Sequence, residues 1–316
     1  MLDIKNRTMN KKRITWNLIS LLLLLTLPNV TQPEISTSVS TDHTSGSSQI
    51  EALKDNDPNV RSRAAEELGK QMNAGAVEPL IHVLIYDDVW SVRKSAAWAL
   101  GEIKDAKAVL PLIRALGHRD WIIRLKAAEA LGKIGNTAAV AALMDSVEDE
   151  NDHVIEKVIW ALGELRDRKA VEQLLGTLKN RLPAVRISTS QALGKIKDSR
   201  TVMPLIEALE NESSWEVKKS ILWALGEIND RHSLPAMVNA LGDENYYVRL
   251  HAEIALEKTG CRAVPFLIPV VHDTKFEART RAVWTLEKIT GQHYGRDTDG
   301  WEKWLLENEG CALKTR

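Results

Sequence analysis

The stretch WSVRKSAAWALGEI at residues 90–103 recurs in altered form along most of this 316-residue chain. Its core is an Ala-Leu-Gly triplet followed by a charged and an aliphatic residue, and the Gly returns every 31 or 32 residues. The repeated glycines are Gly69, Gly101, Gly132, Gly163, Gly194 and Gly226. Leu256 and Leu286 continue the series, with Glu257 and Glu287 in place of Gly. Eight repeats of this period predict a solenoid, in which each unit buries its apolar face only against its neighbours.

Each repeat is predicted to consist of two helices. In residues 108–116 (AVLPLIRAL) apolar side chains recur at helical spacing, and Pro111 falls in the first turn, where it is tolerated. In residues 90–103 one arc of the helical wheel collects the side chains Val92, Ala96, Ala99, Leu100 and Ile103. The predicted fold class is therefore all-α, an α-solenoid of about eight two-helix repeats over residues 50–290.

The ends of the second helices are marked as well. Polar residues stand just before these helices and can accept hydrogen bonds from the first-turn amides. They are Asp57, Asp88, Asp120, Asn151, Ser214 and Asn245. The Gly that follows each Leu is expected to end the helix.

The repeat resembles the HEAT repeat, in the short variety named after the phycobilisome (bilin) lyases, whose consensus has Val-Arg before Ala-x-Ala-Leu-Gly. The matching dipeptides are Val60-Arg61, Val92-Arg93, Ile123-Arg124, Val185-Arg186, Val217-Lys218 and Val248-Arg249. Residues 153–155 (HVI) depart from the pattern at the basic position. The resemblance implies that the basic residue and an acid of the loop, for example Asp87 with Arg93 or Asp243 with Arg249, form a structural ladder between repeats. It also implies that the second helices line a concave surface.

The N-terminal segment has the pattern of an export signal. Basic residues 11–13 precede an apolar run at residues 14–27. As a helix this run spans about 21 Å, short of the roughly 30 Å hydrocarbon core, which favours a signal peptide over a stable membrane anchor. No Ala-x-Ala cleavage site follows, so an uncleaved tether is the alternative. Residues 1–30 therefore predict an exported protein, periplasmic or extracellular, or one held to the membrane only by its N-terminus.

Two further segments flank the repeats. Residues 31–49 are rich in Ser and Thr and almost free of apolar side chains, so they cannot offset the entropy of folding and are predicted to be a flexible linker. Residues 291–316 resemble the tail that closes many bacterial HEAT-repeat proteins. In this tail Trp301 and Trp304 are expected to cover the apolar end of the array.

The exposed side of the second helices is unexpectedly aromatic. In residues 90–103, Trp90, Lys94 and Trp98 lie at about 160°, 200° and 240° from Val92, opposite the packed face. The sixth repeat has the same Trp-x-x-x-Lys-x-x-x-Trp pattern. The predicted ligand-binding groove is lined by Trp90, Lys94, Trp98, Trp121, Trp160, Trp215, Lys219, Trp223, Tyr246 and Trp284.

Four of these tryptophans recur in every second repeat, namely Trp98, Trp160, Trp223 and Trp284. With helices about 10 Å apart they would lie about 20 Å from one another, a distance that about six extended residues cover. The prediction is a scaffold that binds a protein or peptide, since interface hot spots are enriched in Trp. The alternative is that these rings stack on Lys stems and stabilise the array.

Other function classes receive little support from the composition. Lys plus Arg number 42 and Asp plus Glu 43, so the chain lacks the positive field that nucleic acid requires. Only two Cys are present, and no CxxC, P-loop, GxSxG or HExxH motif occurs. Neither a metal nor another cofactor is predicted. Cys261 and Cys311 either pair in an oxidising compartment or remain thiols.

An enzymatic role is the second hypothesis, as a HEAT-like enzyme or an enzyme-accessory protein similar to the bilin lyases or to deoxyhypusine hydroxylase. The hydroxylase holds two irons with His-Glu pairs, but none of the eight His here is followed by Glu. His251 and Glu253 are two residues apart and point to different sides of a helix. Export would also separate the chain from cytoplasmic bilins, so a non-catalytic role is predicted.

Overall fold

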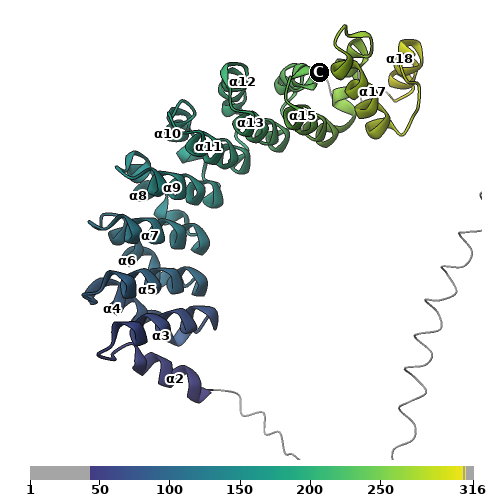
Figure 1. The fold of residues 1–316 in the computed structure, drawn as a ribbon. Helices are drawn as coiled ribbons and strands as arrows, with labels where there is room; N and C mark the ends of the chain where they lie inside the picture. Colours follow the sequence, from purple (N-terminus) through teal and green to yellow (C-terminus); the bar gives the residue numbers. More distant parts are fainter. Residues whose placement is uncertain (1–42, 309, 311–316) are drawn as a thin grey trace, which may run out of the picture. The chain divides into compact units, whose positions relative to one another are not determined.

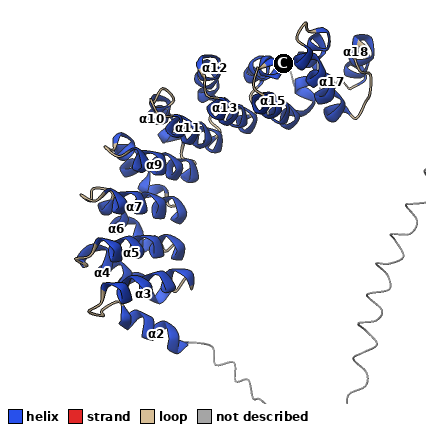
Figure 2. Cartoon of the chain, in the orientation of Figure 1, coloured by secondary structure: helices blue, strands red, loops and turns tan. Residues whose placement is uncertain are grey.

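The computed structural model describes residues 43–308 and residue 310. The predicted signal at residues 1–30 and most of the predicted linker lie outside the described residues. A separate compact unit begins at Thr44, and the description below concerns this unit. All regular structure in its described part is helical, which confirms the predicted fold class (Figure 2). No helix among the described residues combines the length and apolarity needed to cross a membrane.

Within this unit eight helix pairs follow one another (Figure 1). The first helices of the pairs are α2 (His43–Ala52), α4 (Val77–Tyr86), α6 (Val109–Ala115), α8 (Val140–Asp145), α10 (Val171–Thr177), α12 (Val202–Asn211), α14 (Leu234–Asn239) and α16 (Val264–Leu267). The second helices are α3 (Pro58–Lys70), α5 (Trp90–Ile103), α7 (Trp121–Ile134), α9 (Asp152–Leu165), α11 (Pro183–Ile196), α13 (Trp215–Ile228), α15 (Tyr246–Thr259) and α17 (Phe276–Thr290).

Short 3₁₀ turns lead into or out of most first helices. These turns are η1 (Ala74–Ala76), η2 (Ala106–Ala108), η3 (Thr137–Ala139), η4 (Ser146–Glu148), η5 (Arg168–Ala170), η6 (Ser199–Thr201), η7 (Arg231–Ser233), η8 (Ala240–Gly242), η9 (Gly260–Ala263) and η10 (Ile268–His272). Each second helix packs on the second helix of the next pair, from α3 through α17. In Figure 1 the second helices follow the inner side of a curved row and the first helices its outer side.

The recurring Gly of each triplet does not end its helix, so that prediction is wrong. Gly101 and its equivalents are buried inside the second helices, against the next second helix. A Cβ on Gly101 would lie 2.8 Å from the Cα of Ala130, closer than real Cβ contacts come. The Gly therefore allows close helix approach. The residues that end the helices in the left-handed conformation are Lys104, Gly135, Arg166, Lys197, Asn229 and Gly291.

Side chains cap most second helices as predicted. Those that accept a first-turn amide are Asp57, Asp120, Asn151, Ser214 and Asn245. The prediction for Asp88 is wrong, because α5 starts one residue later and Val89 occupies the capping position without a side-chain bond. The Oδ1 of Asp87 instead accepts the Val89 N–H at 2.9 Å.

Charged side chains link consecutive repeats in a ladder, although not in the predicted pairs. The basic residue of one repeat bonds the loop acid of the next: Arg61 Nε donates to Asp87 at 2.7 Å, and Arg124 Nε to Asp149 at 2.7 Å. The ladder continues with Arg186 and Glu212 and with Lys218 and Asp243. Within its own repeat, each Arg instead donates to backbone carbonyls. Arg93 bonds the carbonyl of Asp87, and Arg249 bonds the carbonyl of Asp243 at 2.7 Å.

The ladder changes the ionisation of its acids. Burial acts to raise the pKa of Asp87, but hydrogen bonds from Arg61 and from the Val89 amide outweigh it, and the pKa is lowered from its ordinary value. The pKa of Glu212 is lowered in the same way, with burial opposed by hydrogen bonds from Arg186 and from the Ser214 amide. These carboxylates are therefore held in their charged form between repeats.

One rung of the ladder contains an imidazole instead of a carboxylate. His118 stands at the position of Asp87 and Asp149, and its Nε2 lies 3.0 Å from Arg93 Nη1. Its Nδ1 accepts the Asp120 N–H at 3.0 Å, the bond that Asp87 makes one repeat earlier. A neutral imidazole has one acceptor nitrogen, so it cannot accept from both groups at once.

The two ends of the array differ from its middle. Helix α2 begins at His43, so residues 43–49 are helical and not linker as predicted. At the other end, Trp301 on α18 (Thr298–Glu307) is fully buried, and its indole N–H donates to the Gly295 carbonyl at 2.9 Å. Trp304 and Leu305 are half-buried against the core. This tail covers the apolar surface that the last repeat would otherwise expose.

Candidate ligand-binding groove

The aromatic residues predicted for the groove fall into two rows on the second helices. The first aromatic row consists of the residues that begin five of these helices, Trp90, Trp121, Trp215, Tyr246 and Phe276. Trp90 is 48% exposed, Trp121 39% and Tyr246 53%. Trp215 is half-buried because its ring stacks on Tyr247, with centroids 5.0 Å apart. The sequence prediction did not include Phe276 in the groove, although it is 62% exposed and its register is that of the other four.

The second aromatic row consists of Trp98, Trp160, Trp223 and Trp284, eight residues further along alternate second helices. Trp160 is half-buried, and a Cβ on Gly132 would lie only 2.7 Å from its Cζ3. Trp98 and Trp223 pack over the equivalent glycines of the preceding repeats. The prediction that these three rings stand clear of the packed side is therefore wrong, because the preceding helix reaches their flank. For Trp284 the preceding helix has Glu257 at the position of that Gly, and Trp284 is 50% exposed.

The interfaces between second helices alternate in kind. At three alternate interfaces, from α3–α5 to α11–α13, a Trp of the second aromatic row lies over a Gly, as Trp160 lies over Gly132. At the interfaces between them a Lys bonds a Glu of the preceding helix, as Lys133 bonds Glu102 at 2.6 Å. The other such pairs are Lys195 with Glu164 and Lys258 with Glu227.

The predicted groove lysines lie beside the first aromatic row. Lys94 Nζ lies 5.8 Å from the centroid of Trp90, and Lys219 Nζ lies 5.9 Å from that of Trp215. Neither ammonium group forms an ion pair with a carboxylate of residues 43–308. In the fourth repeat Lys157 lies over Trp160 at 5.0 Å. Sequence reasoning missed Lys157, which stands one position after the register of Lys94.

Two cavities open on this side of the array. The Trp98 pocket has a volume of about 300 Å³, and the Trp223 pocket about 250 Å³. Each is formed by three consecutive second helices, α3, α5 and α7 or α11, α13 and α15. Their lining residues correspond position by position: Glu66 and Gln191, Lys70 and Lys195, Lys94 and Lys219, Ser95 and Ser220, Trp98 and Trp223, Lys126 and His251.

Eight of the twelve lining residues were not among the predicted groove residues, and His251 is the most informative of them. Burial, and to a smaller extent the charge of Lys219, lower the pKa of His251. The imidazole is therefore neutral at neutral pH, mainly because it is partly buried. The sequence did contain a signal for this set, because the residues at all six positions are four repeats apart.

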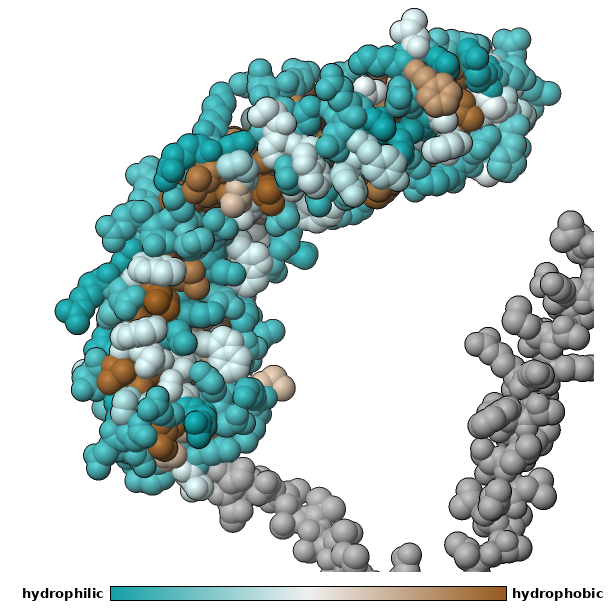
Figure 3. Space-filling view, in the orientation of Figure 1, coloured by the Kyte–Doolittle hydropathy of each residue, from teal (hydrophilic) through white to brown (hydrophobic). Residues whose placement is uncertain are grey.

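The surface of the array is mixed in polarity. Figure 3 shows hydrophobic and near-neutral side chains in patches among hydrophilic ones along the face it displays. The scattered exposed apolar residues on first helices include Tyr86, Leu110 and Met203. Exposed aromatic side chains are more frequent on the second helices, where Trp90, Trp121, Tyr246 and Phe276 share one register.

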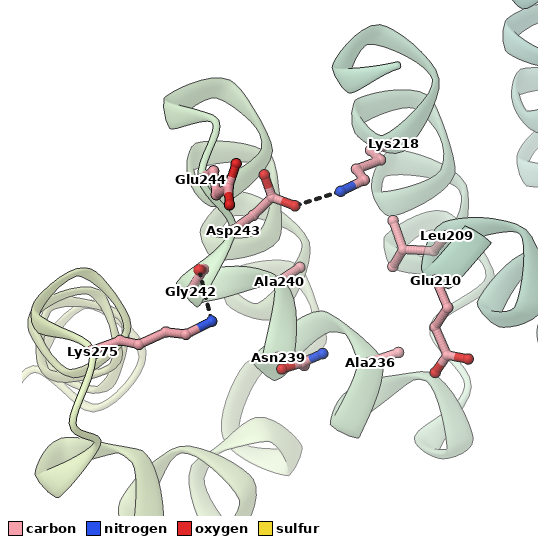
Figure 4. A pocket seen from close by; sticks show the side chains of 10 residues that line it. All are labelled: Leu209, Glu210, Lys218, Ala236, Asn239, Ala240, Gly242, Asp243, Glu244 and Lys275. Atoms are coloured by element: carbon pink, nitrogen blue, oxygen red, sulfur yellow. Dashed lines mark hydrogen bonds and ion pairs between the residues drawn. The ribbon is translucent and has the colours of Figure 1, made fainter. Parts of the chain in front are cut away.

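Another cavity, of about 320 Å³, lies between α12 and η8 on the side of the first helices (Figure 4). Its wall carries the ladder pair Lys218–Asp243, at 2.7 Å, and Lys275, whose Nζ is 3.5 Å from the Gly242 carbonyl. These charges bond within the protein. The cavity therefore belongs to the joints between repeats and is a weaker candidate than the two Trp pockets.

The described residues contain no group of three His, Cys, Asp or Glu side chains able to hold a metal ion. His251 lines the Trp223 pocket, whereas Glu253 is buried and bonds Arg281 and Lys288, each at 2.5 Å. The predicted partner of half-buried Cys261, Cys311, lies outside the described part of the chain. The pairing of the two cysteines stays a prediction.

Comparison with known protein families finds HEAT repeats in this sequence. The family model matches residues 49–99, 77–158, 147–225 and 202–287. No curated protein matches the chain significantly.

Solved structures are similar to this chain at low identity. The crystal structure of an engineered protein has a TM-score of 0.53 at 20% identity and covers 84% of this chain and 82% of that one. The complex of CpcE and CpcF of phycocyanin lyase from Nostoc sp. PCC7120 has a TM-score of 0.47 at 20% identity, covering 83% and 98%. Human deoxyhypusine hydroxylase in complex with glycerol has a TM-score of 0.37 at 21% identity and covers 79% of this chain and 97% of that one. At 20% identity the likeness to the engineered protein concerns the fold alone.

Proposed function

The chain belongs to the HEAT-repeat family, and we propose that it is a non-catalytic scaffold that binds an elongated polypeptide along the second helices. In this proposal the first aromatic row and Trp284 supply the anchors. The half-buried rings of Trp98, Trp160 and Trp223 contribute their free faces, and they also stabilise the array by packing over glycines.

The exposure of the first aromatic row carries the proposal. Packing does not require an aromatic residue at this position, since Pro58, Asp152 and Pro183 begin the other second helices. Aromatic side chains are nevertheless present in five repeats, and four of them are 39% to 62% exposed. Monomers rarely expose such rows, and a ring that a partner covers fully contributes roughly 2 kcal/mol or more.

The dimensions of the row suit an extended chain. From Trp90 to Phe276 it crosses six repeats, about 60 Å at about 10 Å per helix. About 18 extended residues cover this distance. A small molecule would contact only one or two of these rings, so the spacing favours a polypeptide partner.

The proposed place of action is outside the cytoplasm, on the basis of the signal pattern in residues 1–30. The mass of the protein purified from the extracytoplasmic fraction of its host checks this. A mass that lacks the leader supports cleavage and export, and a full-length protein in the membrane fraction supports the tether. A full-length protein found only in the cytosol would contradict both.

Affinity capture from the extracytoplasmic fraction tests the binding role. The bait is the exported protein, compared with a variant in which Trp90, Trp121, Tyr246 and Trp284 are changed to Ala. The matched control changes three exposed apolar residues of first helices, Tyr86, Leu110 and Met203, which are 68%, 67% and 63% exposed.

The proposal expects a protein that the wild type and the control retain and the groove variant loses. Circular dichroism and thermal unfolding must first show that all three proteins are equally folded. Retention of the same set of proteins by all three baits would contradict binding through the aromatic rows.

A further inference from the structure

We propose that the Trp98 pocket and the Trp223 pocket are two copies of one subsite, and that each binds an acidic side chain and an adjacent apolar side chain of the same polypeptide. This inference rests on the proposed function, for which it names the chemical class of the partner. The ligand is a segment with two acidic blocks, joined by a spacer long enough to reach across four repeats.

The equivalence of the pockets is the first argument. The six lining residues of one pocket stand at the same six repeat positions as those of the other. Four of the six positions carry the same residue type in both, including Lys94 with Lys219 and Trp98 with Trp223. The scaffold alone does not demand this agreement, because the repeat between them has Glu156 and Lys157 where the pockets have Lys and Ser.

The second argument is charge. The lysines that flank the Trp98 pocket are neutralised, Lys70 by Glu67 and Lys126 by Glu129. Lys94 is left without a carboxylate in the described part of the chain, and it stands at the pocket beside Trp98. Glu66 also lines this pocket, and its Oε1 accepts the Ser95 hydroxyl at 3.0 Å. The hydrogen bond to Glu67, and to a smaller extent the negative charge of Glu66, raise the pKa of Lys70.

The Trp223 pocket repeats this arrangement with less negative charge. Lys195 is bonded to Glu164 at 2.5 Å, and Gln191 replaces the acid of the other pocket. Lys219 forms no ion pair among residues 43–308, although its charge, after a hydrogen bond from the Ser214 hydroxyl, contributes to the lowered pKa of Glu216, three residues earlier on the same helix. Burial, and to a smaller extent the Lys219 charge, lower the pKa of His251, so the Lys219 charge acts inside this pocket. An anionic side chain of the ligand would form an ion pair with the unpaired ammonium group in each pocket.

The third argument concerns the class of ligand. Each pocket pairs one unpaired cation with the partly exposed face of a Trp, which suits a carboxylate next to an apolar side chain. Single-stranded nucleic acid needs a continuous positive track for its phosphates. Here the two cations lie about 40 Å apart at about 10 Å per helix, and Glu129 and Glu156 lie between them. The observations therefore favour an acidic polypeptide.

Synthetic peptides test the inference with the purified full chain. The main probe is a fluorescein-labelled peptide with two Glu-Leu-Glu blocks joined by a Gly/Ser spacer of about 20 residues, which reaches the required distance. The matched peptides carry Gln or Lys in place of Glu, have a spacer of about four residues, or contain one block only. Labelled oligo(dT) tests binding of single-stranded nucleic acid. Fluorescence anisotropy gives the affinity of each probe.

The expected result is one long two-block peptide per protein, bound at least about 10-fold more tightly than the one-block and short-spacer peptides, because the second contact is intramolecular. Replacing Glu by Gln or Lys should weaken binding by about 10-fold or more. The variants Lys94→Glu and Lys219→Glu should each reduce the two-block affinity to that of one block. Lys169→Glu, the same charge change at an exposed residue of η5, should leave it unchanged.

Three results would overturn the inference: equal affinity for Glu, Gln and Lys peptides, insensitivity to both lysine variants, or tighter binding of oligo(dT). The variants Lys94→Gln and Lys219→Gln remove the positive charge without adding an acid, so a loss of binding that they share with the Glu variants does not come from a folding defect caused by the acid. Failure of the inference remains distinct from failure of the proposed function. A Gln peptide or a captured partner that binds through the aromatic rows would refute acidic recognition and leave the scaffold role intact.

Discussion

At the scale of single residues, the tryptophans of the second aromatic row depend on the glycines beneath them. The absence of a side chain at Gly132 leaves room for the ring of Trp160, and Gly194 does the same for Trp223. The aromatic residue and the small residue thus form one packing unit that spans two repeats. A helical wheel drawn for one helix cannot contain this information, because the neighbouring helix is not on it.

The variant Gly132→Ala should therefore destabilise the protein. Its Cβ would lie 2.7 Å from Trp160 Cζ3 and 3.0 Å from the Cα of Ala161, and overpacking of this kind costs about 1–3 kcal/mol. Urea unfolding measures the change. Gly176→Ala is the control, because Gly176 is exposed within α10 with nothing within 4 Å of its Cβ direction. That substitution should stabilise by about 0.5–1 kcal/mol. Equal effects of the two variants would refute the packing explanation.

A second residue-scale prediction concerns His118. In the variant His118→Asp a carboxylate accepts both from Arg93 and from the Asp120 amide, as Asp87 does from Arg61 and Val89. We expect a gain of about 1 kcal/mol at neutral pH. Urea unfolding with a double-mutant cycle checks it, since the gain should vanish when Arg93 is changed to Met. A gain that survives in the Arg93→Met background would show that the ladder is not its source.

At the scale of elements, the ladder joins each second helix to the loop of the next repeat. Removing the charge of one rung by Glu212→Gln leaves Arg186 without its buried partner, and the loss should be roughly 1–3 kcal/mol. Asp152→Asn is the control, because Asp152 pairs with the exposed Arg181. Its effect should stay within about 0.5 kcal/mol. Unfolding curves in which both variants lose the same free energy would contradict a special role of the ladder.

The same rung predicts a pH dependence. Glu212 has a lowered pKa in the folded chain, so it binds its proton at lower pH there than in the unfolded chain. Its contribution is complete above the ordinary carboxyl pKa of about 4 and is lost as the pH falls through the folded-state value. The stability difference between wild type and Glu212→Gln should therefore shrink on acidification below about pH 4. A difference that grows in acid would show the opposite sign and refute the argument.

The elements themselves were predictable, whereas the pairing of charges between them was not. Helical spacing and capping residues indicated the second helices, and five of six predicted caps are present. The ladder acid stands six positions before the Arg of its own repeat, as Asp87 does before Arg93, and 26 positions after the Arg of the preceding one, Arg61. Both separations recur in a periodic sequence, so only the spatial arrangement distinguishes the two pairings.

The groove was predictable in its position and less so in its composition. The wheel identified the aromatic side of the second helices because this side interrupts the expected polar pattern. It overestimated the exposure of Trp98, Trp160 and Trp223, and it missed the residues that neighbouring helices contribute to the pockets, such as Lys126 and His251. Pockets formed by three helices depend on the spacing of the array, which periodicity alone does not provide.

At the scale of the whole molecule, stability is the sum of contacts between neighbouring repeats, so the ends matter. Trp301 is fully buried, and Trp301→Ala should cost about 3–5 kcal/mol locally. Hydrogen exchange should then show faster exchange of the amides in α16 and α17 than of those in α5 to α9. Leu306→Ala, at a residue 75% exposed, is the control. Uniform acceleration along the chain would contradict a local cap.

The alternation of the interfaces between second helices means that two repeats, and not one, form the smallest unit that can be copied. A Trp-over-Gly interface is always followed by a Lys–Glu interface, from α3 through α15. Losing a single repeat would set two helices of the same kind against each other, with Glu opposite Glu or Lys opposite Lys. Such an array can grow or shrink by recombination only in steps of two, and each step would add or remove one tryptophan of the second row together with its glycine. The length of the protein and the number of tryptophans in its second aromatic row therefore change together.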